Sequence, residues 1–216
     1  MVHRTRLLLS AALVLGGCKA ESLGVQVVRG GPEAISMEDL QRDAWLVGGG
    51  EGKDGWAGFE HRLQQMHTLP AFGRSYRGRG ADAVVCGRKD GRGDRIFVVL
   101  AVNEGAGAGL LRLASLISLT KAWDVQRPPP ETLIFCGVDG PAGLQALHGA
   151  AVAPQDAVTT SFVLGGPPQW GAGLGNEVVA LELGDLPPDP GAIDFRVLQQ
   201  AVVAADTQIR EKLSAP

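Results

Sequence analysis

Apolar positions recur at helical spacing near the start of the chain. In residues 37–47 and again in residues 55–66, apolar side chains fall three and four positions apart, which predicts two helices with one apolar face each. Ser36 is placed to cap the first helix, with Asp39 three residues later in the manner of a capping box. The three glycines at 48–50 are expected to end that helix.

Two runs in the middle of the chain are apolar without alternation. Residues 96–102 read Ile-Phe-Val-Val-Leu-Ala-Val, and residues 132–136 read Thr-Leu-Ile-Phe-Cys. Such runs are typical of strands that are buried on both faces of a parallel sheet. We therefore expect two neighbouring or near-neighbouring parallel strands at the centre of one sheet, joined by a helix predicted over residues 110–123.

Shorter segments complete the predicted sheet. The dipeptide Asp90-Gly91 lies between apolar runs at 83–86 and 95–102, which predicts a hairpin. Further strands are predicted over residues 158–164 and 177–183. Strands that alternate with helices predict an α/β protein, a three-layer α/β/α sandwich around a mostly parallel mixed sheet.

Two more helices follow from the pattern. A short one is predicted over residues 139–148, and a closing helix over residues 194–213. The face of the closing helix that we expect against the core is formed by Val197, Ala201, Ala204, Ala205 and Ile209.

The first residues follow a different pattern. His3, Arg4 and Arg6 form a short basic region, and residues 7–15 form an apolar run broken only by Ser10. This run is too short for a helix that crosses a bilayer, which needs about 20 apolar residues. A basic start followed by a short apolar run and small residues is typical of a cleaved export signal.

The sequence Leu15-Gly16-Gly17-Cys18 resembles the lipobox of bacterial lipoproteins. The resemblance implies a signal peptide over residues 1–17, lipid on Cys18 and a lipidated tether over residues 18–34. It also implies a location in the bacterial cell envelope, with the protein held at a membrane by its lipid anchor. An ordinary signal peptide with an incidental cysteine is the alternative.

Removal of residues 1–17 leaves 199 residues, enough for one domain over residues 35–216. The formal charge changes from −3 to −5, because Arg4 and Arg6 are lost. This mild acidity, without a long basic run, gives no electrostatic reason to expect a nucleic acid partner. Cys86 and Cys136 remain, and a disulfide or two buried thiols both fit an exported chain.

Glycines at 105, 107 and 109 separate a predicted buried strand from a helix, as in dinucleotide-binding proteins. The third position of that fingerprint falls on Leu110 instead of glycine. We therefore interpret these glycines as a tight turn with close packing and expect no cofactor.

The histidines offer no clustered metal ligands. His61 and His67 are six positions apart on a predicted helix and do not share a face, while His148 is isolated. No glycine-flanked serine marks a nucleophile, and nothing around Cys136 and His148 indicates a catalytic pair. The basic loop that contains Arg74, Arg77 and Arg79 is a weak candidate for anion binding, with a solvated loop as the simpler interpretation.

Five short motifs occur along residues 36–148: Phe72-Gly73-Arg74, Asp82-Ala83-Val84-Val85, Val102-Asn103-Glu104, Leu111-Arg112-Leu113-Ala114 and Val138-Asp139-Gly140-Pro141-Ala142-Gly143-Leu144. In this order they resemble zinc-dependent aminopeptidases and their glutamate carboxypeptidase relatives. The resemblance implies a zinc-exopeptidase-like fold.

The same resemblance assigns the family's chemical positions to residues of this chain. Val102 stands at the first metal-binding histidine, and only Glu104 keeps a carboxylate nearby. Pro141 and Ala142 stand at the general-base glutamate and the adjoining ligand glutamate, and Gly165 at a later aspartate. The bridging aspartate falls in a shortened stretch at 105–109, and no histidine follows His148. The catalytic metal is therefore expected to be lost.

These inferences lead to one expected function and two alternatives. We expect a non-catalytic domain, tethered to a membrane, that binds a peptide or an envelope protein. One alternative is an active hydrolase that uses an unrecognised site near Cys136 or Glu104. The other is an envelope lipoprotein with a purely structural role.

Overall fold

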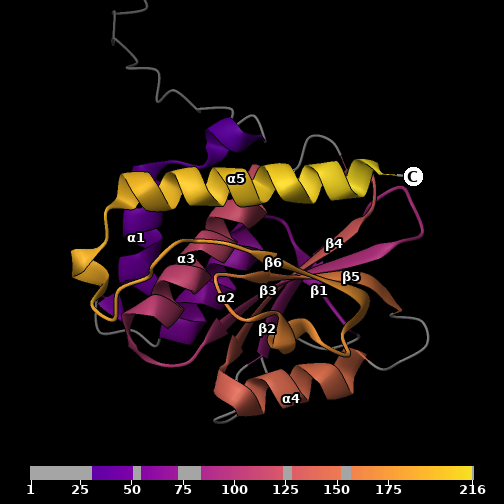
Figure 1. Cartoon of the computed structure of the whole chain (residues 1–216), viewed down its shortest axis with the longest axis horizontal. Coiled ribbons are helices and arrows are strands. Elements are labelled where there is room, and N and C mark those ends of the chain that lie inside the picture. Colours follow the sequence, from indigo (N-terminus) through magenta and orange to yellow (C-terminus); the bar gives the residue numbers. More distant parts are fainter. Residues whose placement is uncertain (1–30, 51–54, 73–83, 124–127, 152–156, 216) are drawn as a thin grey trace, which may run out of the picture.

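The computed structural model describes residues 31–50, 55–72, 84–123, 128–151 and 157–215. Helices cover both faces of one six-stranded sheet (Figure 1). The strands, in the order in which they lie in the sheet, are β1 (Leu69–Pro70), β2 (Val84–Lys89), β4 (Thr132–Asp139), β3 (Ile96–Asn103), β5 (Val158–Leu164) and β6 (Gly175–Leu181).

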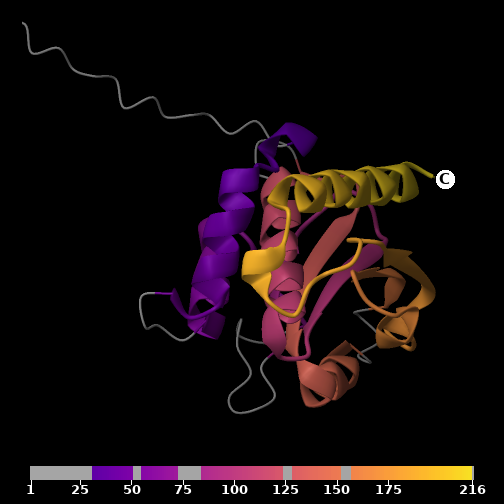
Figure 2. The ribbon, with the colours of Figure 1, turned by 60° about the vertical axis from the view of Figure 1, so that its left-hand side comes forward.

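One helix layer is larger than the other (Figures 1 and 2). It contains α1 (Met37–Val47), α2 (Gly55–Gln65), α3 (Ala106–Ala122) and α5 (Phe195–Ser214), whereas α4 (Gly140–Ala151) covers the opposite face. The described residues also form short 3-10 turns at η1 (Pro32–Ala34), η4 (Pro168–Gly171) and η5 (Pro190–Ala192). The predicted three-layer α/β/α sandwich is confirmed.

The central strands pair as the sequence predicts. β3 and β4 are parallel neighbours from Ile96↔Thr132 to Asn103↔Asp139, and they form the middle of the sheet. Successive side chains of β3 enter opposite layers, so that Phe97 packs with the large helix layer and Val98 with the α4 side. Burial on both faces explains why these strands are continuously apolar.

The first helices also begin and end as expected. The Ser36 Oγ accepts a hydrogen bond from the N–H of Asp39 at 3.1 Å, and α1 ends at Gly48. Among the helices of the described ranges, none is long and apolar enough to cross a bilayer.

The predicted hairpin is wrong, because β4 lies between β2 and β3. The loop after β2 crosses the segment that enters β4, where Gly93 donates to the carbonyl of Pro130 at 2.8 Å. Gly91 also contacts this segment so closely that a Cβ would lie 2.0 Å from the carbonyl carbon of Glu131. The chain does reverse direction at Asp90-Gly91, as predicted. However, β3 does not pair with β2, because β4 lies between them.

Several boundaries also differ from the sequence expectation, and both β4 and α4 end three residues later than predicted. Helix α3 begins at Ala106 and takes the glycines into its first turn, where a Cβ on Gly107 would lie 2.4 Å from the carbonyl oxygen of Pro188. Gly107 therefore serves close packing, whereas Gly105, the N-cap with a φ of +81°, serves the turn, so the interpretation as a tight turn with close packing is confirmed. Strand β6 begins and ends two residues earlier than predicted.

The buried face of α5 is rotated from the predicted one. Val197 is 55% exposed, while the buried residues are Leu198, Val202, Ala205, Asp206, Ile209 and Leu213. The prediction is confirmed for Ala205 and Ile209 and is wrong for Val197 and Ala204, which are exposed. It left out Leu198 and Val202, as well as Asp206, whose polar side chain interrupts the apolar pattern of the inner face. Burial raises the pKa of Asp206, and the hydrogen bond from Arg210 at 2.6 Å opposes this effect.

A disulfide joins Cys86 and Cys136, which are register partners in β2 and β4. Their Cα atoms are 4.2 Å apart, and the half-cystine of Cys136 is fully buried. The question left open by the sequence is thereby answered in favour of the bonded form.

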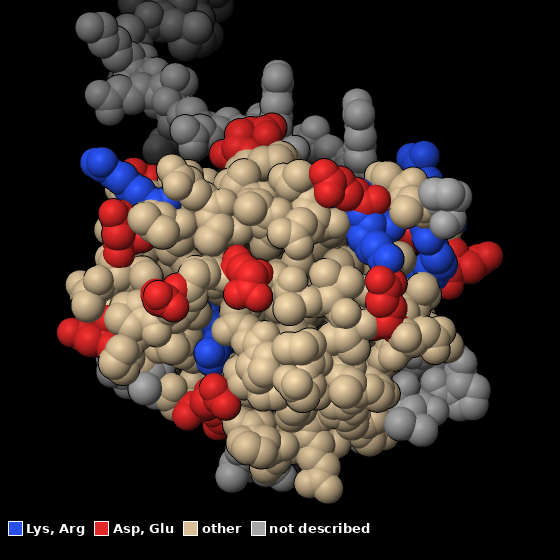
Figure 3. Space-filling view, in the orientation of Figure 1, with Lys and Arg blue, Asp and Glu red and all other residues tan. Residues whose placement is uncertain are grey.

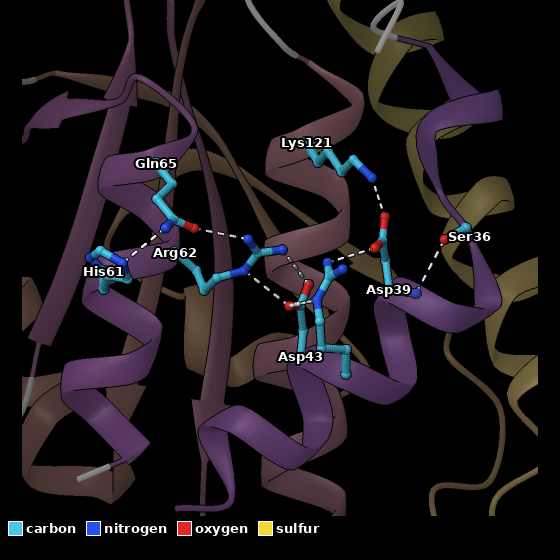
Figure 4. A network of polar contacts seen from close by, with 8 residues as sticks. Ser36, Asp39, Asp43, His61, Arg62, Gln65 and Lys121 are labelled. Atoms are coloured by element: carbon cyan, nitrogen blue, oxygen red, sulfur yellow. Dashed lines mark hydrogen bonds and ion pairs between the residues drawn. The ribbon is translucent and has the colours of Figure 1, made fainter. Parts of the chain in front are cut away.

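Polar contacts connect α1, α2 and α3 within the large helix layer (Figure 4). The guanidinium of Arg62 donates to both carboxylate oxygens of Asp43, at 3.0 and 3.3 Å. Asp39 pairs with Arg42 at 2.5 Å and contacts the ammonium of Lys121. The network thus links the N-terminal helices to the helix that lies directly on the sheet.

The two acidic residues of this network differ in burial. Burial raises the pKa of Asp43, whose side chain is only 1% exposed, and Arg62 opposes this rise. Burial also acts to raise the pKa of Asp39, but Lys121 and Arg42 outweigh it, so that the pKa lies below its usual value. Asp43 is therefore the residue that depends most on its partner.

We expect Asp43→Asn to lower the free energy of unfolding by about 2 kcal/mol, because Arg62 loses its ionic partner in a desolvated site. The matched control is Asp90→Asn in the exposed Arg88–Asp90 pair, with an expected loss below about 0.5 kcal/mol. Denaturant unfolding of both variants measures the difference. Equal losses of unfolding free energy in the two variants would contradict a larger contribution of the Asp43–Arg62 pair to stability.

Candidate functional site

Several parallel strands end at one edge of the sheet, and two of them end in polar residues. Asn103 and Asp139 are the last register partners of β3 and β4, and the amide of Asn103 donates to the carboxylate of Asp139 at 3.2 Å. An open depression of about 450 Å³ lies here, lined by Asn103, Glu104, Gly105, Asp139, Gly140 and Pro141. Such an edge is where α/β proteins commonly bind ligands.

Arg112 lies beside this depression and connects the ends of two strands, β3 and β5. From α3 its Nε donates to the carbonyl of Gly165 at 2.7 Å, and its Nη1 to the carbonyl of Val102 at 3.3 Å. The same Nη1 is 3.4 Å from the carboxylate of Glu104. A single guanidinium therefore holds together the segments that follow β3 and β5.

The surroundings of Arg112 are partly desolvated. Its side chain is 12% exposed, and the guanidinium carbon lies 5.0 Å from the ring centroid of Trp170. Burial lowers the pKa of Arg112, and Glu104 opposes this effect. An arginine nevertheless stays protonated under such conditions, so the site contains a fixed positive charge.

The positions assigned through the family resemblance meet at this edge. Val102 is buried and contributes its carbonyl, Glu104 is exposed, and Gly165 directly follows β5 with a φ of +60°. Pro141 and Ala142 lie in the first turn of α4, where both are exposed. Of these five residues, only Glu104 has a side chain that could act as a metal ligand.

The donor chemistry at this edge does not fit a zinc ion. Zinc in hydrolases is held by three or more imidazole, thiolate or carboxylate groups, and no such group of three occurs among the described residues. His61 and His67 are exposed on and after α2, and His148 lies on α4 with its Nε2 3.3 Å from the carbonyl of Trp170. We derive no reaction through a metal here.

The structure also answers two other questions raised by the sequence, on the thiol of Cys136 and on the glycines at 105–109. Cys136 has no free thiol, because it forms the disulfide with Cys86. The first turn of α3 is occupied by the protein's own backbone, since the N–H of Gly107 donates to the carbonyl of Pro188 at 2.8 Å. Cys18 and the basic loop with Arg74, Arg77 and Arg79 lie outside the described residues.

Three residues at this edge have a role that was not predicted from the sequence. Arg112, Asn103 and Asp139 were noted only as parts of family-like motifs, although together they form its polar contacts. One signal was available: Arg112 lies between Leu111 and Leu113 and is the only charged residue in the first four turns of a mostly apolar helix. Its partners could not be identified, because they lie on two other segments of the chain.

A second hollow adjoins the depression. A smaller space lined by Trp56, Leu110 and Leu113 shares Asn103 with the depression. It shares Leu110 with a larger, mostly apolar hollow beside Trp45, Pro190 and Phe195. These spaces follow one another around the start of α3, which gives this end of the molecule an uneven surface with room for a ligand.

No protein-family model and no curated protein matches the sequence. Solved structures do match. A glutaminyl cyclase from Porphyromonas gingivalis has a TM-score of 0.59 at 9% identity, with 84% of this chain and 98% of that chain covered.

Two further structures are similar to nearly the same extent. A zinc-dependent exopeptidase from Parabacteroides distasonis has a TM-score of 0.56 at 7% identity, covering 87% of this chain and 99% of that chain. A glutaminyl cyclase from an Acidobacteriales bacterium also has a TM-score of 0.56, at 12% identity, covering 84% and 93%. The chain therefore has a zinc-exopeptidase-like fold, as the sequence motifs predicted.

We expect Arg112→Met to lower the free energy of unfolding by about 2 kcal/mol, because the carbonyls of Val102 and Gly165 lose a charged donor. Arg112→Lys is expected to recover only part of this loss, since an ammonium lacks the planar fork. Arg196→Met, at an exposed position of α5, is the matched control and should change little. Chemical denaturation measures all three, and an Arg112→Met variant as stable as the control would contradict the role of the guanidinium.

Proposed function

We propose that the protein is a bacterial lipoprotein whose zinc-exopeptidase-like domain has lost catalysis and binds a peptide or an envelope protein. Lipid on Cys18 would hold it at a membrane, with residues 1–17 removed as the signal peptide and residues 18–34 as the tether. The domain over residues 35–216 would then act by binding or scaffolding rather than by hydrolysis.

The observation that carries the loss of catalysis is the environment of Arg112. A zinc hydrolase needs several ligands for the ion and a base that activates its water. Here one guanidinium contacts the carbonyls of Val102 and Gly165, and the carboxylate near it, Glu104, is its ionic partner. A fixed cation among carbonyl oxygens is an unfavourable neighbour for a second cation, which supports a domain that works without metal.

Two observations support export. The first is the lipobox-like sequence at Cys18. The second is the disulfide between Cys86 and Cys136, because disulfides persist mainly in oxidising compartments. The disulfide also means that Cys136 cannot act as a free nucleophile. Of the two regions considered for an active hydrolase, the Glu104 region therefore remains.

The surface supports a binding role over a purely structural one. The open depression at the strand ends lies beside a series of hollows that includes the apolar one next to Trp45, and concave apolar surfaces with a few polar groups are typical of ligand sites. Figure 3 shows no continuous basic area among the described residues on the face it presents. This distribution supports a partner other than nucleic acid.

The purified protein is expected to contain no stoichiometric zinc and to show no rise in melting temperature when zinc is added. A ligand that binds the folded state must stabilise it by mass action. Val102→His should not create zinc binding, because one imidazole does not replace a ligand set. Elemental analysis and calorimetric titration test this, and one tightly bound zinc per chain would support the hydrolase instead.

Cys18→Ser is expected to abolish lipid attachment and to release the protein from membranes. The reason is that the lipid is proposed to be joined to the sulfur of Cys18. Metabolic labelling with a fatty acid, followed by membrane fractionation, compares the variant with the wild type. Equal labelling of both proteins would exclude Cys18 as the attachment site.

A further inference from the structure

Strand β6 forms one border of the sheet. Its neighbour in the sheet order is β5 on one side, and no strand of the described residues pairs with it on the other. The strand has seven residues, a full length for an edge strand, whereas β1 at the opposite border has two. β6 is therefore the longer of the two free edges.

The hydrogen bonds around β6 show which of its backbone groups point outward. The carbonyl of Leu181 accepts from the N–H of Gly165 at 2.8 Å, and the carbonyl of Glu177 accepts from the Oγ of Ser161 at 3.4 Å. Both acceptors therefore face β5. Because backbone groups alternate in direction along a strand, the N–H and C=O of Asn176, Val178 and Ala180 point away from the sheet.

These outward groups lack a backbone partner within the described parts of the chain. Native proteins usually protect such an edge with proline, lysine, a bulge or a covering element. Residues 175–181 contain neither proline nor lysine, and the one charge, on Glu177, is paired with Lys212 of α5 at 2.8 Å. Val178, Val179 and Ala180 are only half-buried.

We propose that β6 pairs with β6 of a second copy of this chain, in antiparallel orientation and with Val178 on the two-fold axis. Each outward-facing residue would then exchange two backbone hydrogen bonds with its counterpart. Val178 faces Val178 of the second copy, and Asn176 faces Ala180 of the second copy. The two sheets join into one continuous sheet through the dimer.

The sequence of β6 favours a second copy as the occupant because this register is self-complementary. Glu177 faces Val179 of the second copy, so the two Glu177 carboxylates are not opposite each other and no like charges meet. Apolar Val178 meets its own copy at the centre. A two-fold contact of this kind also covers the β6 edge of both copies at once, whereas a head-to-tail contact would leave the β6 edge of one copy uncovered.

The test uses the full chain in detergent and measures its mass by sedimentation equilibrium. The wild type is expected to dimerise, and Val178→Lys to raise the dimer dissociation constant more than about tenfold, because two ammonium groups meet on the axis. The control, Val197→Lys, alters an equally apolar side chain that is exposed on α5 and should leave the dimer unchanged. Thermal melting monitored by circular dichroism checks that both variants fold.

Val178→Cys tests the register. It should form a cross-linked dimer under oxidation, because antiparallel partners lie within disulfide distance, whereas Val197→Cys should not. A monomeric wild type at every concentration would overturn the proposal, as would a dimer that Val178→Lys leaves intact. The Cys18→Ser chain is measured alongside, so that a dimer that depends on lipid, which would also contradict the proposal, is distinguished from one that depends on β6.

Discussion

The rest of the structure depends on the burial of two parallel strands on both faces. β3 and β4 fill the middle of the sheet, and both are continuously apolar. Two buried faces require two covering layers, which α3 with its neighbouring helices and α4 supply. Because the strands are parallel, each must be followed by a helix that returns the chain to the other end. Their last residues then necessarily meet at one edge, and this determines where a site can form.

Charge at that edge follows from the same geometry. Strand ends leave carbonyl groups that need donors, as for Val102 and Gly165. In this chain the donor is the guanidinium of Arg112, which reaches the edge from α3. The positive charge at the strand ends is therefore that of a side chain. Glu104 lies where it can balance that charge, and Trp170 covers the guanidinium from the side of η4. Contacts within the protein thus place a cation and its counter-charge at the ends of these strands.

Local signals made most elements predictable from the sequence. The cap at Ser36 and the apolar runs of β3 and β4 are encoded within a few residues, and each was predicted correctly. The hairpin failed because strand order depends on distant partners: nothing near Asp90 reveals that β4 enters between its flanking strands. The face of α5 was predicted only in part for a related reason, since Asp206 is buried and pairs with the partly exposed Arg210, and such compensation is not visible in an apolar pattern. At the site, the meeting of Val102, Glu104 and Gly165 followed from the resemblance, but the contacts of Arg112 depend on the tertiary fold.

The similarity to glutaminyl cyclases and a zinc-dependent exopeptidase persists at 7–12% identity. A likeness at such distances shows a common fold, whose buried strands are recognised here by their apolar pattern. Ligand side chains at the strand ends lie outside the buried runs and contribute little to that pattern. They can therefore be replaced without loss of the fold, provided that the strand-end carbonyls still find donors. Arg112 satisfies this condition, and the exposed Glu104 has a reason to be present as its counter-charge even where no reaction requires a carboxylate.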